Sequence, residues 1–465
     1  MDGKEVDSSM SESLALKRIR SLLDDDSFVE VNALVSARTT NFAVKPKPES
    51  PDGVITGYGQ IEGNPVFVYS QDRASLGGTM GEMHAKKICN LYDLASRTAA
   101  PVIGFLDSAG FRLDESVDAL DAFGRLLDKM LWAQENLIQI SAVMGQCAGG
   151  MTMIPAISDF TFMTKDAKMF VNAPHTLADD PALARNFNSA DYQNSVSGQA
   201  QVLESEDAVI EKIRTIVPFL TEKNYGVCSE EDLNRMLSTA AIESGDIRTI
   251  LSECADTALM EIRPDYAPEM VTGFLKLNGI TVGVIGNSAA LYDENGEKTV
   301  DLPSGLTACG CRKAAEHVRF CRSFDIPLLT VSAAEGFACS KETETALAPA
   351  LADLAGELHG ADSAARVSLI IGDTYGTAYT ILNAKAIGGA DISFAWAGVK
   401  TGMMQAEKAA AILFAGADAA ETAKQAAALD EFQNAVESAA ARGSVDVVID
   451  PAETRKHLIM AFSML

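Results

Sequence analysis

The sequence predicts an α/β protein built from two similar tandem halves, residues 1–235 and 236–465. Three observations lead to this fold class. The chain repeats itself at a nearly constant distance, its apolar runs are short and rich in β-branched residues, and segments of helical periodicity lie between those runs. Strands that alternate with helices indicate parallel sheets with crossover helices. Length alone suggests roughly three domains, but these observations favour two.

The repetition extends over four collinear pairs of segments. In the clearest pair a threonine, two glycines and a valine coincide, and the aromatic and Ile/Leu positions are alike. Because the order is the same and the offset stays between 216 and 231 residues, coincidence is a poor explanation. The paired segments are 19–31 with 247–262, 56–66 with 272–282, 101–111 with 327–337, and 141–149 with 368–376.

Each half begins with a strand hairpin, which in the first half has strands over 55–61 and 66–70 and a turn at 62–64. The segments that follow alternate between helices, at 83–95 and 118–136, and strands, at 102–106 and 138–144. These two strands are short, apolar and bounded by Pro or Gly, as strands buried on both faces of a sheet should be. Near the end, the alanine-rich tract 405–441 predicts helices that pack rather than bind a ligand.

Composition and charge exclude several classes of protein. Of the 465 residues, 47% are apolar and 22% are charged, which rules out a disordered or fibrous chain. The formal net charge of −26 has the wrong sign for a general nucleic-acid binder. No stretch approaches the ~18 to 20 consecutive apolar residues that span a bilayer, and the first residues lack the features of a secretory signal. We therefore expect a cytoplasmic protein.

The cysteines and histidines do not show the spacing of metal ligands. The eight cysteines are scattered, and the one-residue gap between Cys309 and Cys311 does not fit structural zinc sites. We expect reduced thiols that pack in the interior. The five histidines have no mutual spacing typical of ligands, and the chain lacks a Gly-x-x-x-x-Gly-Lys-Ser/Thr phosphate loop. No bound metal and no ATP chemistry are expected on this chain.

Three glycine loops of the first half follow predicted strands. They contain Gly77-Gly78, the stretch 107–112 and the stretch 147–151. Glycines between a strand and a helix leave backbone N–H groups uncovered, and the positive end of the helix dipole adds to them. Two such loops from adjacent strands could present donors to one anion or developing oxyanion. Each loop by itself is also consistent with a tight turn or with close packing of a helix on a sheet.

At these residues the sequence resembles the biotin-dependent acyl-CoA carboxyltransferases. This family includes the β subunits of propionyl-CoA carboxylase, the transcarboxylase large subunit and the carboxyltransferase subunits of sodium-pumping decarboxylases. The likeness covers almost the whole chain, and its segments are 52–54, 81–88, 107–108, 145–150, 271–274, 286–287, 319–321 and 450–456. It implies two tandem crotonase-like domains of the ClpP/crotonase superfamily, each a ββα spiral. It also implies a dimer-based homo-oligomer, usually a hexamer, with an active site between two subunits.

The resemblance implies that CO2 moves between biotin and a short-chain acyl-CoA, with propionyl-CoA and methylmalonyl-CoA expected first. Residues 1–235 would bind the coenzyme A thioester, and residues 236–465 would form the biotin side. Because the chain has no Ala/Val-Met-Lys-Met biotinylation site, a separate biotin carboxyl carrier protein is the expected partner. A biotin carboxylase or a membrane decarboxylase subunit would complete the complex. Biotin would itself be the base, so few acid–base motifs are expected.

Negative charge would develop on the thioester oxygen and on the ureido oxygen of biotin, and one preorganised donor to such an oxygen is typically worth ~3 to 4 kcal/mol. The resemblance assigns these donors to backbone N–H groups: Ala109, Gly110, Gly149 and Gly150 for the thioester, Thr377 and Ala378 for the ureido group. The residues expected to contact coenzyme A or biotin are Lys86, Lys87, Gly77, Gly78, Arg112, Tyr375, Gly376 and Thr380. A second basic cluster comprises Arg312, Lys313, Arg319 and Arg322. For the basic clusters the alternative is a solvated helix face, and for Arg112 it is a structural ion pair.

Several departures from the family pattern bear on activity. In the first-half loop, Ala109 and Phe111 stand where the family has Gly and Ala, and Phe111 is expected to reshape the pocket wall. Thr377 replaces a glycine, and a β-branched side chain disfavours a positive φ. Glu335 lies in a segment that departs from the family's Asp-x-Pro-Gly-Phe.

Two other functions stay open at this point. A biotin-independent crotonase-like enzyme, such as an acyl-CoA hydratase or decarboxylase, would need a catalytic carboxylate near Gly150, and Asp114 and Glu115 are the candidates. A non-catalytic subunit that binds acyl-CoA within a carboxylase complex would account for the altered positions Glu335 and Thr377. The direction of carboxyl transfer is also open.

Overall fold

The computed structural model describes residues 12–42, 51–173, 187–221, 232–293, 295–360 and 364–465. The chain divides into two compact units, residues 1–222 (unit 1) and 223–465 (unit 2). The boundary at residue 235 stays a prediction, because residues 222–231 lie outside the described part.

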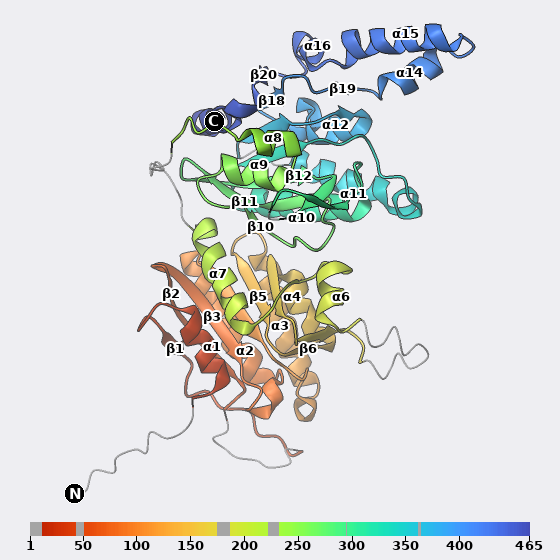
Figure 1. The fold of residues 1–465 in the computed structure, drawn as a ribbon. Coiled ribbons are helices and arrows are strands. Elements are labelled where there is room, and N and C mark those ends of the chain that lie inside the picture. The colour runs from red at the N-terminus through yellow and green to blue at the C-terminus, as the bar shows by residue number, and fades with distance from the viewer. Residues whose placement is uncertain (1–11, 43–50, 174–186, 222–231, 294, 361–363) are drawn as a thin grey trace, which may run out of the picture. The chain divides into compact units, whose positions relative to one another are not determined.

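Unit 1 contains a sheet of seven described strands, in which β1, β2 and β3 are antiparallel neighbours and the later strands add in parallel (Figure 1). In spatial order these strands are β1 (Val29–Val31), β2 (Val54–Ile61), β3 (Asn64–Gln71), β4 (Val102–Leu106), β5 (Gln139–Val143), β7 (Phe160–Thr164) and β9 (Gln201–Leu203). A separate parallel pair consists of β6 (Gln146–Ala148) and β8 (Lys168–Phe170). The α-helices are α1 (Leu14–Leu22), α2 (Glu82–Thr98), α3 (Val117–Ala133), α4 (Met153–Ile157), α6 (Ala190–Ser195) and α7 (Glu206–Thr221), and the 3-10 turns are η1 (Leu76–Gly78), η2 (Leu113–Glu115) and η3 (Gly149–Thr152).

Unit 2 repeats this plan, with a described seven-stranded sheet of matching order and strand direction. Its strands are β10 (Met260–Glu261), β11 (Met270–Leu277), β12 (Ile280–Asn287), β15 (Leu328–Ser332), β16 (Arg366–Ile370), β18 (Ile392–Trp396) and β20 (Val447–Ile449). Two small pairs are β13 (Ala290–Tyr292) with β14 (Lys298–Asp301), and β17 (Thr374–Tyr375) with β19 (Thr401–Gly402). The helices are α8 (Thr239–Ser244), α9 (Ile247–Cys254), α10 (Ala308–Ser323), α11 (Lys341–His359), α12 (Gly376–Leu382), α13 (Lys385–Gly388), α14 (Ala406–Leu413), α15 (Ala419–Leu429), the π-turn η5 (Asp430–Asn434), α16 (Val436–Ala441), the 3-10 turn η6 (Pro451–Glu453) and α17 (Thr454–Met464).

The repeat is visible in single hydrogen bonds as well as in the order of strands. An isolated parallel bridge joins Met80 to Phe111 in unit 1, and the same bridge joins Leu306 to Phe337 in unit 2. The predicted α/β class with two similar tandem halves is therefore confirmed. The predicted elements of the first half end within three residues of the observed ends, and the tract 405–441 is largely helical as expected, with η5 interrupting it.

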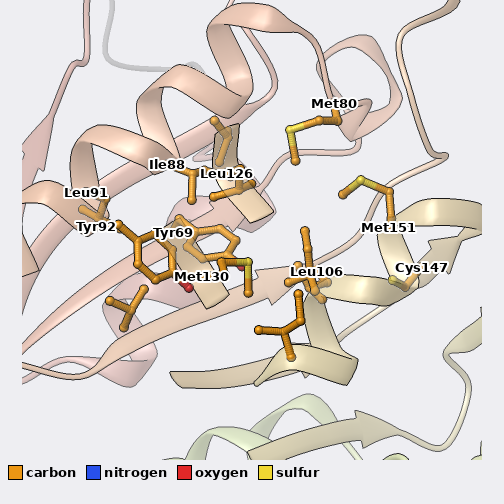
Figure 2. Close-up of a cluster of buried hydrophobic side chains, with 14 of the residues drawn as sticks. Tyr69, Met80, Ile88, Leu91, Tyr92, Leu106, Leu126, Met130, Cys147 and Met151 are labelled. Atoms are coloured by element: carbon orange, nitrogen blue, oxygen red, sulfur yellow. The ribbon is translucent and has the colours of Figure 1, made fainter. Parts of the chain in front are cut away.

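The core of unit 1 lies between the sheet and the helix pair α2 and α3. Figure 2 shows Ile88, Leu91 and Tyr92 of α2 meeting side chains of α3 and of the strands. Strands β4 and β5 are buried along their whole length, so both faces of the sheet are covered. Gly104 in β4 is required by packing, because a Cβ there would lie 2.2 Å from the ring of Tyr69.

Two further findings concern the membrane and the cysteines. Among the described residues no helix combines the length and apolar character needed to cross a bilayer. The described cysteines are free, and Cys89, Cys147, Cys254, Cys311 and Cys321 are buried, while Cys339 is exposed.

Candidate functional site

The three glycine loops of unit 1 lie against one another at the carboxyl ends of neighbouring parallel strands. They follow β3, β4 and β5, which pair in that order. Ala109 N donates to Gly77 O at 3.1 Å and Ser108 N donates to Gln146 O at 2.7 Å, so the middle loop is bonded to both of its neighbours. At Gly78, where φ is 63°, a Cβ would lie 2.3 Å from the carbonyl oxygen of Asp107. Only glycine fits this close approach.

A buried carboxylate, that of Asp107, holds the second and third loops together. Its Oδ1 accepts a hydrogen bond from Gln146 N at 3.2 Å, and its Oδ2 lies 3.3 Å from Arg18 Nη1. Arg18 is in turn paired with Glu206 of α7 at 2.5 Å. Gly145 leaves room for this carboxylate, because a Cβ there would lie 2.2 Å from Oδ1. Sequence reasoning missed Arg18 and Glu206, since no local spacing connects residues so far apart in the chain.

The backbone amides at this junction differ in what they already bond. Ala109 N–H is used by Gly77 O, and Gly110 N–H donates to Ser108 Oγ at 3.1 Å, so both predicted donors of the middle loop are occupied. Phe111 N–H makes no hydrogen bond within the described residues, although Gly110 O and Arg112 N on either side both bond Met80. Gly149 and Gly150 open η3, and the first amides of a helix have no acceptor within it. Phe111, which the sequence did not place among the donors, therefore joins them as a candidate.

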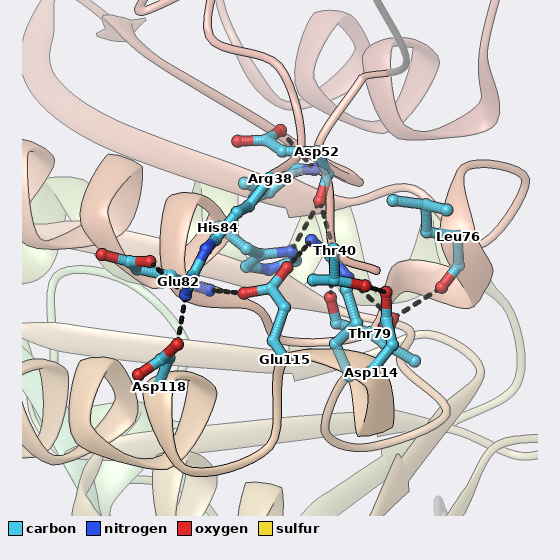
Figure 3. Close-up of polar contacts among 12 residues, drawn as sticks. Arg38, Thr40, Asp52, Leu76, Thr79, Glu82, His84, Asp114, Glu115 and Asp118 are labelled. Atoms are coloured by element: carbon cyan, nitrogen blue, oxygen red, sulfur yellow. Dashed lines mark hydrogen bonds and ion pairs between the residues drawn. The ribbon is translucent and has the colours of Figure 1, made fainter. Parts of the chain in front are cut away.

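Arg112 is buried and ties together four segments around these loops. Its Nη1 donates to Glu115 Oε1, and its Nη2 donates to Asp52 O and Thr79 O, each at 2.8 Å. Glu115 Oε2 accepts from Glu82 N at the start of α2, at 2.5 Å. Figure 3 shows how Asp52, Thr79 and Glu115 converge from separate parts of the chain. Of the two roles considered for Arg112, the structure contains the ion pair.

Behind Arg112, three more titratable groups are buried at the start of α2. Lys87 Nζ lies 3.4 Å from Asp52 Oδ1 and donates to Val54 O at 2.5 Å. Burial raises the pKa of Asp52 against the opposing charge of Lys87, and burial lowers the pKa of His84 to about 3. His84 is therefore neutral. Lys87 was expected to meet a phosphate of coenzyme A, but it is enclosed and joins α2 to β2, whereas its neighbour Lys86 is exposed.

The second basic cluster divides in the same way. Lys313 is fully buried and its Nζ donates to Tyr266 O at 2.8 Å. Arg319 and Arg322 both pair with Glu357, at 2.8 and 3.0 Å. Arg312 is exposed on α10. Lys313 was expected to meet a phosphate together with the three arginines, but its ammonium group does not face solvent.

In unit 2 the equivalent glycine loop joins β17 to α12. Tyr375 is the residue before α12 and provides no side-chain cap, so the amides of Thr377 and Ala378 lie in an uncapped first turn. The positive φ of this loop, 62°, is that of Gly376, and Thr377 is not among the residues with positive φ. The strain expected from the Thr377 substitution is therefore absent. Tyr375 Oη lies 3.3 Å from Asp373 Oδ2, and burial raises the pKa of this tyrosine. Thr380 Oγ1 lies 3.5 Å from Gly376 O.

A cavity of about 650 Å³ opens elsewhere in unit 2, between the segments 303–309 and 335–343. Its lining combines the aromatic ring of Phe337, the carboxylates of Glu269 and Glu335, and the thiols of Cys309 and Cys339. These segments correspond in the repeat to the neighbourhood of the glycine loops in unit 1, because Leu306–Phe337 is the counterpart of the Met80–Phe111 bridge. Glu335, noted in the sequence as a departure, is exposed beside this cavity.

Comparison with known proteins gives one consistent family. The model of the carboxyl transferase domain matches residues 7–465. The α subunit of methylmalonyl-CoA decarboxylase from Propionigenium modestum is 33% identical, over 97% of this chain and 90% of that protein. The propionyl-CoA carboxylase β chain of Roseobacter denitrificans is also 33% identical, with the same coverage. The crystal structure of transcarboxylase 12S, a hexamer with hydrolysed methylmalonyl-coenzyme A bound, superposes with a TM-score of 0.89 at 30% identity, over 98% of this chain and 90% of that one.

Proposed function

The chain belongs to the carboxyl transferase family of biotin-dependent acyl-CoA carboxyltransferases, and from this premise we propose that it moves CO2 between biotin on a separate carrier protein and a three-carbon acyl-CoA. Propionyl-CoA and methylmalonyl-CoA are the substrates that the names of its relatives suggest. Bound biotin would supply the ureido nitrogen that carries CO2 and that accepts the α-proton of the substrate. The residues of this chain would hold and polarise the thioester.

The observation that carries the proposal is the junction of glycine loops in unit 1. The amide of Gly150, in the uncapped first turn of η3, lies next to a loop in which Phe111 N–H is free of hydrogen bonds among the described residues. We assign the thioester oxygen to these amides, because the amides of Ala109 and Gly110 are already bonded. Donors fixed by a buried network need no reorganisation when the enolate forms, and each is worth ~10²- to 10³-fold in rate.

For the ureido oxygen of biotin we propose the amides of Thr377 and Ala378 in unit 2. They fit this role because α12 lacks a side-chain cap and because the glycine before them takes the unusual backbone conformation. Tyr375 and Thr380, on either side of these amides, would border the same group. The phosphates of coenzyme A are assigned to Lys86, which is exposed, with Arg312 as a candidate from unit 2.

The biotin-independent alternative finds little support in the carboxylates available to it. Both oxygens of Glu115 are engaged, one by Arg112 and one by Glu82 N, and the side chain is buried. Asp114 accepts a hydrogen bond from Thr40 at 2.9 Å. A catalytic base must reach the proton that it removes, and both groups are held by other partners.

We further propose that the chain forms a homo-oligomer, by likeness to the transcarboxylase hexamer, and that a biotin carboxyl carrier protein docks on this oligomer.

The test is isotope exchange between labelled methylmalonyl-CoA and free biotin, with the purified full-length chain. The proposal predicts biotin-dependent transfer of label that is lost when Gly150 is replaced by valine. A product formed equally well without biotin would support the hydratase or decarboxylase alternative. Binding of acyl-CoA without any turnover, measured by calorimetry, would support the non-catalytic subunit. Either of these results would overturn the proposal.

A further inference from the structure

We propose that the ring of Phe111 limits the length of the acyl group, so that this residue selects a three-carbon acyl-CoA over longer homologues. The inference deepens the proposed function and rests on it, because it takes the thioester to bind at the junction of glycine loops. It concerns a residue that stands where the family has alanine.

The ring of Phe111 lies directly against Gly150. A Cβ built on Gly150 would be 3.0 Å from Cε2 and 3.2 Å from Cζ of that ring. The ring therefore fills the side of Gly150 on which any other residue would carry its side chain. Phe111 is partly exposed, so it borders the surface of the junction as well as the core beneath it.

The ring is held by its backbone and by a second aromatic ring. Gly110 O accepts from Met80 N and Met80 O accepts from Arg112 N, both at 2.9 Å, which fixes the backbone on each side of Phe111. Arg112 is anchored further by its buried ion pair. The ring packs edge to face on Phe123 of α3, with centroids 4.9 Å apart. Phe123 is buried in the core, so it limits the movement of the Phe111 ring.

A thioester oxygen bonded to the amides of Phe111 and Gly150 would lie about 3 Å from each nitrogen. The acyl chain would start one bond away from that carbonyl carbon, beside the ring of Phe111 that borders Gly150. A short acyl chain fits beside this ring without overlapping it, whereas each added methylene needs further space next to the ring. One methylene too many in an apolar pocket typically costs ~10- to 200-fold in specificity.

Unit 2 provides an internal comparison. Phe337 occupies the same position, since its bridge to Leu306 matches the bridge of Phe111 to Met80. Yet Phe337 is 45% exposed and borders the cavity of about 650 Å³. The ring of Phe111 in unit 1 instead lies against Gly150 and Phe123. This assigns the size limit to the packing of Phe111 on Gly150 and Phe123, and not to the presence of a phenylalanine alone.

The experiment replaces Phe111 with alanine and measures two quantities on the full-length chain. The first is the dissociation constant for propionyl-, butyryl- and hexanoyl-CoA by calorimetry. The second is biotin-dependent carboxyl transfer with the same series. We expect the preference for propionyl-CoA over butyryl-CoA to fall by ~10-fold or more. The matched control is Phe337→Ala, which should leave the chain-length preference unchanged because it alters the equivalent ring of unit 2.

The outcomes separate the inference from the function on which it rests. A wild-type chain that transfers no carboxyl group would refute the proposed function. An active wild type with an unchanged preference in Phe111→Ala would refute the inference alone. If Phe111→Ala fails to fold, Phe111→Leu keeps most of the packing and should relax the preference partly. Phe111→Trp should shift it the other way, toward acetyl-CoA, and the same preference in both variants would overturn the proposal.

Discussion

Exchanging Arg112 for methionine should destabilise unit 1 strongly, and exchanging Glu115 at the same time should cost less than the two single losses added together. Arg112→Met leaves the buried carboxylate of Glu115 without its partner and removes the donor to Asp52 O and Thr79 O. Breaking a buried ion pair on one side costs ~3 to 5 kcal/mol. At ~2 to 4 °C per kcal/mol for a unit of this size, the melting temperature should fall on the order of 10 °C.

The assay is thermal unfolding of the full-length chain for Arg112→Met, Glu115→Leu and the double variant. Since the double variant leaves neither charge buried alone, its loss should be smaller than the sum of the single losses by ~1 to 3 kcal/mol. The matched control is Lys165→Met, which breaks an exposed pair with Glu204 and should leave the melting temperature nearly unchanged. Losses that simply add would show that Arg112 and Glu115 do not stabilise each other.

Three further predictions concern the two glycine loops and a buried lysine. Gly150→Val should abolish carboxyl transfer while the chain still folds, because the new side chain meets the ring of Phe111; retained turnover would exclude this loop from the thioester site. Thr377→Gly should leave biotin-dependent transfer unchanged or improve it, because the positive φ belongs to Gly376, and a collapse in rate would reveal a role for the threonine side chain. Burial lowers the pKa of Lys313 to about 7 from its usual 10.5, so its contribution to stability is present above about 10.5 and is lost as the pH falls through about 7. Lys313→Met lacks this loss, so its melting temperature should gain on the wild type as the pH is lowered from 10 to 7, and parallel curves would contradict the shifted pKa.

The roles of individual charged residues show where sequence reasoning stops. Lys86 and Lys87 are adjacent and of one type, so no sequence pattern distinguishes them, yet one is exposed and the other is enclosed with Asp52. Lys313 is likewise enclosed, while its neighbour Arg312 faces solvent. The face of a helix that becomes buried depends on which strand it packs against. That contact joins residues tens of positions apart, which no local spacing records.

The backbone amides of the site show the same limit. The glycine loops and their order along the chain were readable from the sequence, because glycine, proline and β-branched residues have local conformational preferences. Which amide in a loop stays free of hydrogen bonds was not, because it depends on an acceptor in a neighbouring loop. Gly77 O accepts the hydrogen bond of Ala109 N–H, and Ser108 Oγ accepts that of Gly110 N–H. The candidate donor of this loop is therefore Phe111 N–H.

The sequence by itself determined the duplicated α/β architecture, the order of its strands and helices, and the family. The architecture and the order of its elements follow from periodicity and repetition along the chain, and the family follows from the resemblance of its motifs. The tertiary structure alone decided that Arg112 forms a buried ion pair and that Lys87 is enclosed. It also decided that Phe111 packs against Gly150 while Phe337 borders a cavity. These outcomes depend on contacts between distant segments, whose distances and burial exist only after the chain has folded.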